Sequence, residues 1–258
     1  MSTLTRNIRV CIEPSTWLRP TQTDLQWIGD EEYSSKDGSC LLQLKKDSEI
    51  RFGPAFYKAA IHGRDGQRIL DFGERRFLSC SGYGRGRTTL CGPWSPVSLS
   101  LALPELLSGR PAPGNNLARM NVFDVSRQRQ IAAWDFESLV IHKMWSPDGK
   151  LYLFRDVYNI YTFSVGGLTL SSISTSRSPY CFVLEGGFVC VIEESGQVSV
   201  LDGADGDLLA TEHISVDRYT VRHAMFDENQ NCILVLLKCQ YGPDADELCF
   251  GIRLQKEH

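Results

Sequence analysis

The stretch SGYGRGRTT, residues 81–89, is the part of this chain whose composition most resembles an anion-binding loop. Glycine lets backbone amides approach a phosphate, and Arg85 and Arg87 could pair with its charge. A dinucleotide-binding loop, however, must open a helix after a strand, and a P-loop ends in Lys-Ser or Lys-Thr. Neither context surrounds this stretch. We interpret it as a connecting loop in which Tyr83, Arg85 and Arg87 are candidate contacts for a protein partner.

Short catalytic motifs are absent from the sequence, which contains neither the GxSxG nucleophile elbow nor the HExxH zinc-protease motif. The five histidines show no paired motif spacing. His142 and His223 stand three residues before Trp145 and Phe226, which predicts equivalent structural positions. We therefore predict no catalytic residues. An enzyme whose site is assembled from distant loops is the alternative, because such a site leaves no local motif.

Metal-binding patterns are equally weak. The nine cysteines include no CxxC pair, and most lie in apolar, strand-like runs, where a free cysteine is a small buried hydrophobe. DGADGD, residues 202–207, resembles part of a calcium loop, but His213 stands where the bidentate glutamate belongs. We expect hairpin turns here and at GPDADE, residues 242–247, and we expect no metal or cofactor.

The elements that position these residues are predicted to be β-strands. No segment has the apolar spacing of an amphipathic helix, and the one expected helical turn is PELLSG, residues 104–109. Alternating apolar runs bounded by Gly, Pro, Asp, Asn and Ser recur instead, as in NIRVCIE, SCLLQLK, NIYTFSV, FVCVIE and QVSVLD. This pattern is typical of short antiparallel strands, so we predict an all-β fold.

A turn followed by an apolar strand repeats along the chain. Trp145-Ser-Pro-Asp-Gly149 precedes LYLF, and Trp94-Ser95-Pro96 precedes SLSLAL. Phe226-Asp-Glu-Asn229 precedes CILVLL, and Glu185-Gly186-Gly187 lies within YCFVLEGGFVCVI. The spacing of about 40 residues matches one four-stranded propeller blade. We expect the two tryptophans to pack between neighbouring blades.

A hairpin follows each of these units, so that two hairpins in tandem make four strands. The chain, residues 1–258, is thus predicted to be one small single-domain β-propeller of five four-stranded blades. The candidate blades are 22–72, 87–136, 139–174, 178–214 and 219–254. The last of these has only three strands, and we predict that residues 7–13 supply its fourth, because closure removes an exposed sheet edge.

The stretch WSPDGKLYLF, residues 145–154, resembles the SPDG-type turn of TolB-type and WD-repeat-like β-propellers. In those families this hairpin links the inner two strands of a blade. The resemblance implies a propeller fold for this chain. At 94–96 Val97-Ser98 replaces the Asp-Gly, and the Gly-His dipeptides of WD repeats are missing.

PELLSGRPAPGNNLAR, residues 104–119, is an insertion in the second candidate blade. Binding functions are often placed on insertions that a rigid scaffold carries. The candidate contacts here are Leu106, Leu107, Arg110 and Asn115. Because residues 81–89 precede the first strand of the same blade, both features are expected to share one end of the molecule.

Composition favours a soluble binding protein. The chain is 42% apolar and 22% charged, with a formal net charge of −4, which gives no general electrostatic reason to bind nucleic acid. The N-terminal residues have no apolar signal-peptide core, and the longest nearly apolar stretch, 232–237, is too short to span a bilayer. We expect a cytoplasmic monomer that binds no membrane.

The predicted function is a non-catalytic protein-binding module. One version is a stand-alone inhibitor, such as an immunity-type protein that neutralises a toxin or effector, because an acidic surface complements a basic partner. Two alternatives remain open: a scaffold subunit of a larger complex, and a hydrolase or lyase with its site at the channel mouth of the propeller.

Overall fold

The computed structural model describes residues 8–16, 30–49, 55–78, 92–107, 116–140, 142–156, 159–174, 180–239 and 247–256. All regular elements in these ranges are antiparallel β-strands, and none of them is a helix. The all-β prediction is thus confirmed, whereas the helical turn at 104–109 is wrong. Pro104 and Leu106 belong to a strand and pair with Met120 and Ala118. A short local helical preference is outweighed by this ladder.

Two four-stranded sheets are antiparallel meanders, in which consecutive strands pair in order. The first consists of β10 (His142–Trp145), β11 (Leu151–Arg155), β12 (Asn159–Ser164) and β13 (Thr169–Ser174). The second consists of β14 (Tyr180–Val183), β15 (Phe188–Ile192), β16 (Gln197–Asp202) and β17 (Leu208–His213).

The third four-stranded sheet joins the two ends of the chain. Its strands are β18 (Tyr219–Asp227), β19 (Cys232–Cys239), β20 (Glu247–Lys256) and β1 (Ile8–Pro14). β1 pairs with β20, with Val10 opposite Leu254, so the predicted fourth strand is confirmed. Ile8 and Val10 are buried, while Arg9 between them is exposed. The alternation in this strand thus directs its apolar residues into the core.

The remaining eight strands form one continuous sheet. They are β2 (Glu31–Ser34), β3 (Cys40–Glu49), β4 (Ala55–Gly63), β5 (Arg68–Asp71), β6 (Phe77–Leu78), β7 (Ser100–Leu106), β8 (Ala118–Asp124) and β9 (Arg129–Phe136). The sequence predicts two separate blades here, at residues 22–72 and 87–136. β6 joins them, because Phe77 pairs with Tyr57 of β4 on one side and with Glu105 of β7 on the other.

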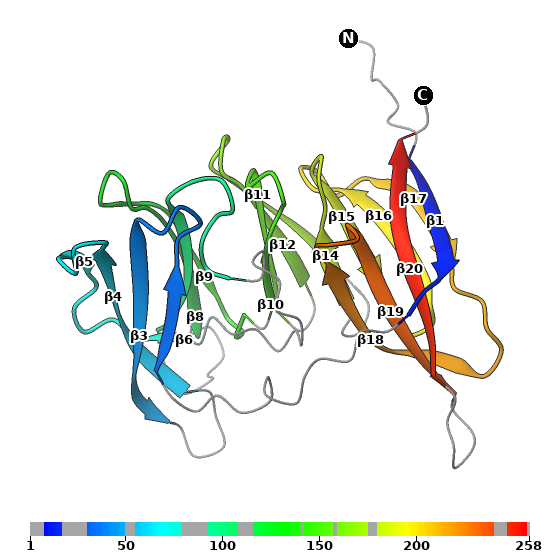
Figure 1. Cartoon of the computed structure of the whole chain (residues 1–258), viewed down its shortest axis with the longest axis horizontal. Helices are drawn as coiled ribbons and strands as arrows, with labels where there is room; N and C mark the ends of the chain where they lie inside the picture. The colour runs from blue at the N-terminus through cyan, green and yellow to red at the C-terminus, as the bar shows by residue number, and fades with distance from the viewer. Residues whose placement is uncertain are drawn as a thin grey trace, which may run out of the picture.

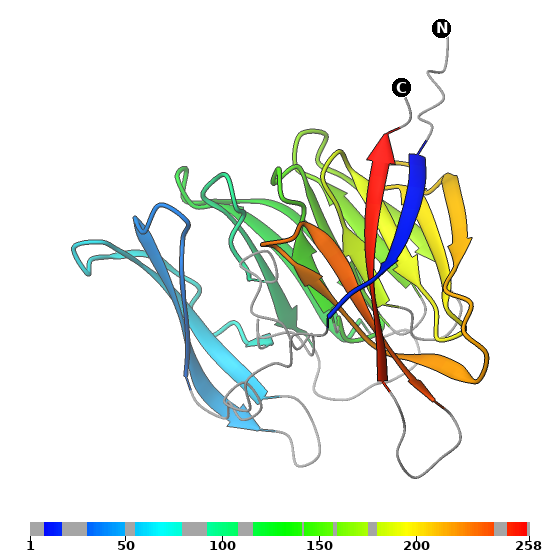
Figure 2. The same cartoon turned by 45° about the vertical axis from the view of Figure 1, so that its right-hand side comes forward.

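Five strand groups can be distinguished: β2–β5, β7–β9, β10–β13, β14–β17, and β18–β20 with β1. They follow one another in chain order along the long axis of the molecule (Figure 1). β3–β5 lie at one end, and the sheet that contains β1 and β20 lies at the other. Figure 2 shows the groups arranged around an arc. Neighbouring sheets contact through their first strands, β10 with β14 and β14 with β18. The buried core consists of three clusters, and each cluster combines residues of different strand groups.

The repeated turn links the first two strands of each group. Ser146 N donates to Leu151 O (2.9 Å), and the Ser146 hydroxyl accepts from Leu151 N (2.9 Å) and donates to Asp148 Oδ1 (2.6 Å). Gly149 has φ +65°, a conformation that glycine adopts without steric cost. The tight turn therefore results from the Ser-Pro-Asp-Gly residues themselves.

One further copy of this turn, at Ser35–Cys40, is not among those predicted from the sequence. Ser35 N donates to Cys40 O (2.8 Å), and the Ser35 hydroxyl donates to Asp37 Oδ1 (2.7 Å). Gly38 has the same φ of +65° as its counterpart. Because Ser34 stands where the later copies have tryptophan, the pattern is recognisable only from Ser-x-Asp-Gly.

The two tryptophans pack between groups, as expected. Trp94 Nε1 donates to Tyr33 O (2.8 Å), and Trp145 Nε1 donates to Pro93 O (3.2 Å). Both side chains are buried, and each hydrogen bond reaches the first strand region of the preceding group. Their role is to fix neighbouring groups relative to each other.

Candidate functional site

Two of the seven candidate contact residues lie in the described part of the chain. Leu106 is the last residue of β7 and is partly buried, and Leu107 follows it with 38% of its surface exposed. Tyr83, Arg85, Arg87, Arg110 and Asn115 lie outside the described residues, so their predicted contacts stay predictions.

The insertion extends the hairpin between β7 and β8. Leu106 pairs with Ala118, and Leu107 N donates to Leu117 O (2.9 Å), so the ladder continues to the edge of the described residues. The next two groups have short turns at the corresponding place. They are closed by Asp156 N to Asn159 O (3.0 Å) and by Glu193 N to Gln197 O (2.9 Å). The longer hairpin is thus a departure from the neighbouring repeats.

The described residues from which both predicted features extend are neighbours. Phe77 of β6 pairs with Glu105, and Leu106 N donates to Arg76 O (2.8 Å). Leu78 is the last described residue before the segment that contains residues 81–89. The two features therefore originate from adjoining strands of one sheet.

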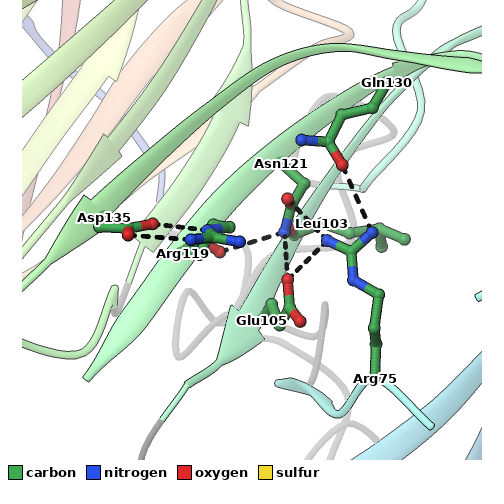
Figure 3. Close-up of polar contacts among 7 residues, drawn as sticks. All are labelled: Arg75, Leu103, Glu105, Arg119, Asn121, Gln130 and Asp135. Carbon is green, nitrogen blue, oxygen red and sulfur yellow. Dashed lines mark hydrogen bonds and ion pairs between the residues drawn. The ribbon is translucent and has the colours of Figure 1, made fainter. Parts of the chain in front are cut away.

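A polar network centred on Arg75 lies at the base of this hairpin (Figure 3). Arg75 Nη2 donates to Glu105 Oε2 (2.5 Å) and to Asn121 Oδ1 (2.7 Å), and Asn121 Nδ2 donates to the same Glu105 oxygen (3.1 Å). Arg75 Nη1 reaches Gln130 Oε1 (3.3 Å). The network joins the segment before β6 to three strands of the sheet.

This network is largely buried, so its polar groups need hydrogen-bond partners within the protein. The side chain of Glu105 is 9% exposed, that of Arg75 is 30% exposed, and Asn121 is fully buried. The guanidinium carbon of Arg75 also lies 5.4 Å from the ring centroid of Phe77 and 5.6 Å from that of Phe123. A buried carboxylate is stable only when it is paired and hydrogen-bonded, and here each requirement is met by a different element.

A second ion pair follows on the same strands. Arg119 donates to Asp135 through Nε (2.5 Å) and Nη2 (2.9 Å), which is a bidentate geometry. This pairing lowers the pKa of the Asp135 carboxyl and raises that of Arg119, in each case mainly through the hydrogen bond between them. The hairpin base therefore carries two arginines held by acceptors.

The acid at the end of the second strand recurs in the next group. By its distance from the repeated turn, Asp156 corresponds to Glu105, and Tyr161 corresponds to Asn121. The Tyr161 hydroxyl donates to Asp156 Oδ2 (3.1 Å), and Ser138 donates to the same oxygen (2.8 Å). Burial and this carboxylate raise the pKa of Tyr161 to about 12. A satisfied buried acid is thus a structural feature shared by two groups.

Arg75 and Glu105 are not among the residues predicted from the sequence. The available signal was FGERRF, a charged run directly before an apolar pair, together with a single glutamate in the apolar run SLALPEL. Pairing between these segments requires β6, which is too short to show an alternating pattern.

Further chemistry in the described residues is limited. None of their His, Cys, Asp and Glu side chains form a group of three or more that could hold a metal ion. None of the described segments forms a helix long and apolar enough to cross a membrane. DGADGD is the turn between β16 and β17, as predicted, with Asp202 N donating to Asp207 O (2.8 Å).

No protein-family model matches the sequence, and no curated protein matches it either.

Proposed function

We propose that the strand groups are the five blades of a small β-propeller. The support comes from the four-strand order of three of the sheets, from the contacts between first strands, and from the two tryptophan hydrogen bonds between successive groups. The pairing of β1 with β20 further supports the proposal, because propellers must protect their sheet edges.

Small-angle X-ray scattering tests this architecture. A compact chain of 258 residues has a radius of gyration of about 18 Å. A closed five-bladed disc should give a value near this and a single-peaked distance distribution. A markedly larger radius with a long tail would indicate an open array of sheets and would contradict the propeller.

We further propose that the molecule is a non-catalytic protein-binding module that uses the β7–β8 hairpin. The observation that carries this proposal is the long hairpin at the place where the next two groups have short turns. The described base of this hairpin is held by the Arg75–Glu105 ion pair and by the hydrogen bond from Asn121 to Glu105, which give it a rigid support. Rigid support lowers the entropy lost when a loop binds a partner.

The partner class follows from the residues on this hairpin. Leu107 offers an exposed apolar contact, and Arg110 and Asn115 add a charge and an amide. This mixture of apolar and arginine contacts is typical of protein interfaces. An inhibitor that binds one protein through this end is the version we favour.

Photo-cross-linking tests the proposed surface. A photoreactive residue replaces Leu107 in one variant and Val97 in a control variant. Both side chains are exposed, and they lie beyond opposite ends of β7. In the cell of origin, Leu107 should yield a discrete protein adduct that the Val97 variant does not give. Identical adduct patterns from both positions would refute the assignment of this end.

A further inference from the structure

A second cluster of polar residues lies where three strand groups meet. Arg155 ends β11, and β11 contacts β14. Burial raises the pKa of Tyr180 and Cys181, the first two residues of β14, and the charge of Arg155 opposes this rise. On its other side, Tyr180 contacts β18: its hydroxyl donates to Arg222 O (2.6 Å), and its ring meets that of His223 edge-on at 5.9 Å.

Arg155 differs from the arginines at the hairpin base. Its side chain is partly buried, and Nη1 is buried without a hydrogen-bond partner among the described residues. Arg75 and Arg119, by contrast, both donate to carboxylates. A buried donor without an acceptor costs free energy and is rare in native proteins. An acceptor from outside the chain would remove this cost.

A β-bulge shapes the same junction. Val221 pairs with Leu237 and His223 with Leu236, so Arg222 between them is the extra, unpaired residue of β18. In the other register shifts the extra residue lies in β3, β5, β9 or β17, which are second or fourth strands, whereas this one lies in a first strand. Bulges redirect side chains and are frequent beside binding sites. Here the bulge leaves Arg222 exposed and turns its carbonyl to Tyr180.

More positive than negative side chains act on Tyr180. Burial raises the pKa of Tyr180 and Glu194 raises it further, whereas Arg155 and Arg222 act in the opposite direction. Glu194 is held beside β18 because Val221 N donates to its carbonyl (3.1 Å). Among the charged groups that act on Tyr180, two arginines outnumber one glutamate, which favours an anion at this junction.

We propose that Arg155, at the junction where Tyr180 holds the bulge at Arg222, binds the carboxylate of a small organic acid. A guanidinium presents paired N–H donors whose spacing matches the two oxygens of a carboxylate. Because Arg155 and Tyr180 are both partly buried, the site suits a small molecule and not a broad surface. The site uses later strand groups than the hairpin and does not depend on the protein-binding proposal.

Thermal unfolding with added anions tests this site. Acetate, malonate and phosphate are compared with chloride at constant ionic strength, for the wild type, Arg155→Met and Arg127→Met. Arg127 is the matched control, because it is an exposed arginine in a turn of another sheet. A carboxylate at ten times its Kd should raise the Tm of the wild type and of Arg127→Met by on the order of 3 °C. Arg155→Met should show no such rise.

Two further results sharpen the test. Without added carboxylate, Arg155→Met should melt at or above the wild-type temperature, because it removes an unsatisfied buried donor. Tyr180→Phe should keep the fold and reduce the carboxylate shift, because it releases the Arg222 carbonyl. The proposal is overturned if the wild type shows no shift with either carboxylate, or if Arg155→Met keeps the shift.

Discussion

Single residues in this molecule act mainly through turns and junctions. The serine at the start of the repeated turn is buried at Ser35, Ser95 and Ser146, and in the first and third copies its hydroxyl bonds to an aspartate two residues later. The side chain thus replaces a backbone partner inside the turn. In these two groups the short polar bonds stabilise the turn that follows the first strand.

Asp37 in the first of these turns gives a prediction for acid conditions. Hydrogen bonds from Ser39 and Ser35 lower its pKa to about 2. A carboxyl whose pKa is lower in the folded state stabilises the fold above its unfolded pKa near 3.8, and this contribution is lost as the pH falls through 2. Asp37→Asn should therefore be less stable than the wild type at pH 7, and most of the difference should be lost at pH 2. Urea unfolding at pH 7, 3 and 2 measures it, and a constant difference would contradict the assignment.

Gly149 gives a prediction about turn packing. A Cβ at this position would meet Val97 Cγ2 and lie 2.8 Å from Ser95 Oγ, in the turn of the preceding group. Gly149→Ala should cost about 2–4 kcal/mol, because it combines overpacking with a positive φ. Gly66→Ala is the control: φ is +78° with no atom within 4 Å, so about 1 kcal/mol is expected. Equal losses in chemical denaturation would show that the turns of neighbouring groups do not pack together.

Among the elements, the sheet of eight strands depends on β6 and the segment before it. Arg75→Met should destabilise the protein by about 2–3 kcal/mol, because it leaves Glu105 buried without its ion-pair partner. The double variant Arg75→Met/Glu105→Gln should recover part of this loss, since the uncompensated charge is gone. Urea unfolding of the two single variants and the double variant measures the coupling. Additive losses would mean that the pair does not act as a unit.

How far the sequence predicts these elements depends on the length of their patterns. β12, β15 and β16 are clear in advance, because β12 and β16 alternate over their first four residues and β15 is a continuous apolar run, each between turn-forming residues. The pairing of β1 with the last sheet follows from a missing fourth strand. β6 has only two residues and no period, so neither the joined sheet nor the Arg75 network could be predicted. Such contacts depend on tertiary pairing and not on local sequence.

The sequence predicts where the candidate site lies, but it does not predict the arginine contacts found in the structure. Leu106 and Leu107 are predicted partner contacts because the insertion departs from the repeat, and the structure places them at an extended hairpin. Arg155 gave no signal, because an arginine at the end of an apolar strand is ordinary in sequence. Only its lack of an acceptor and the bulge at Arg222 distinguish it.

For the whole molecule, the two ends of the chain must remain paired. Val10 on β1 is 6% exposed and belongs to a core cluster with residues of three sheets. Val10→Asp should cost more than about 3 kcal/mol, because an unpaired charge would enter this core. Arg9→Asp, on the exposed face of the same strand, should cost less than about 1 kcal/mol. Thermal unfolding compares the two variants, and similar losses would show that β1 contributes little to the folded molecule.

Shortening the β7–β8 hairpin tests most directly whether this hairpin binds a protein. A four-residue turn replaces residues 108–116, so that Leu107 and Leu117 still pair and the Arg75 network is retained. A matched control replaces the β12–β13 turn, residues 165–168, with Asn-Gly. Affinity capture with quantitative mass spectrometry compares both with the intact chain. We expect the amount of captured partner to fall at least tenfold for the shortened hairpin and to stay unchanged for the control. Undiminished capture by the shortened hairpin would contradict the claim.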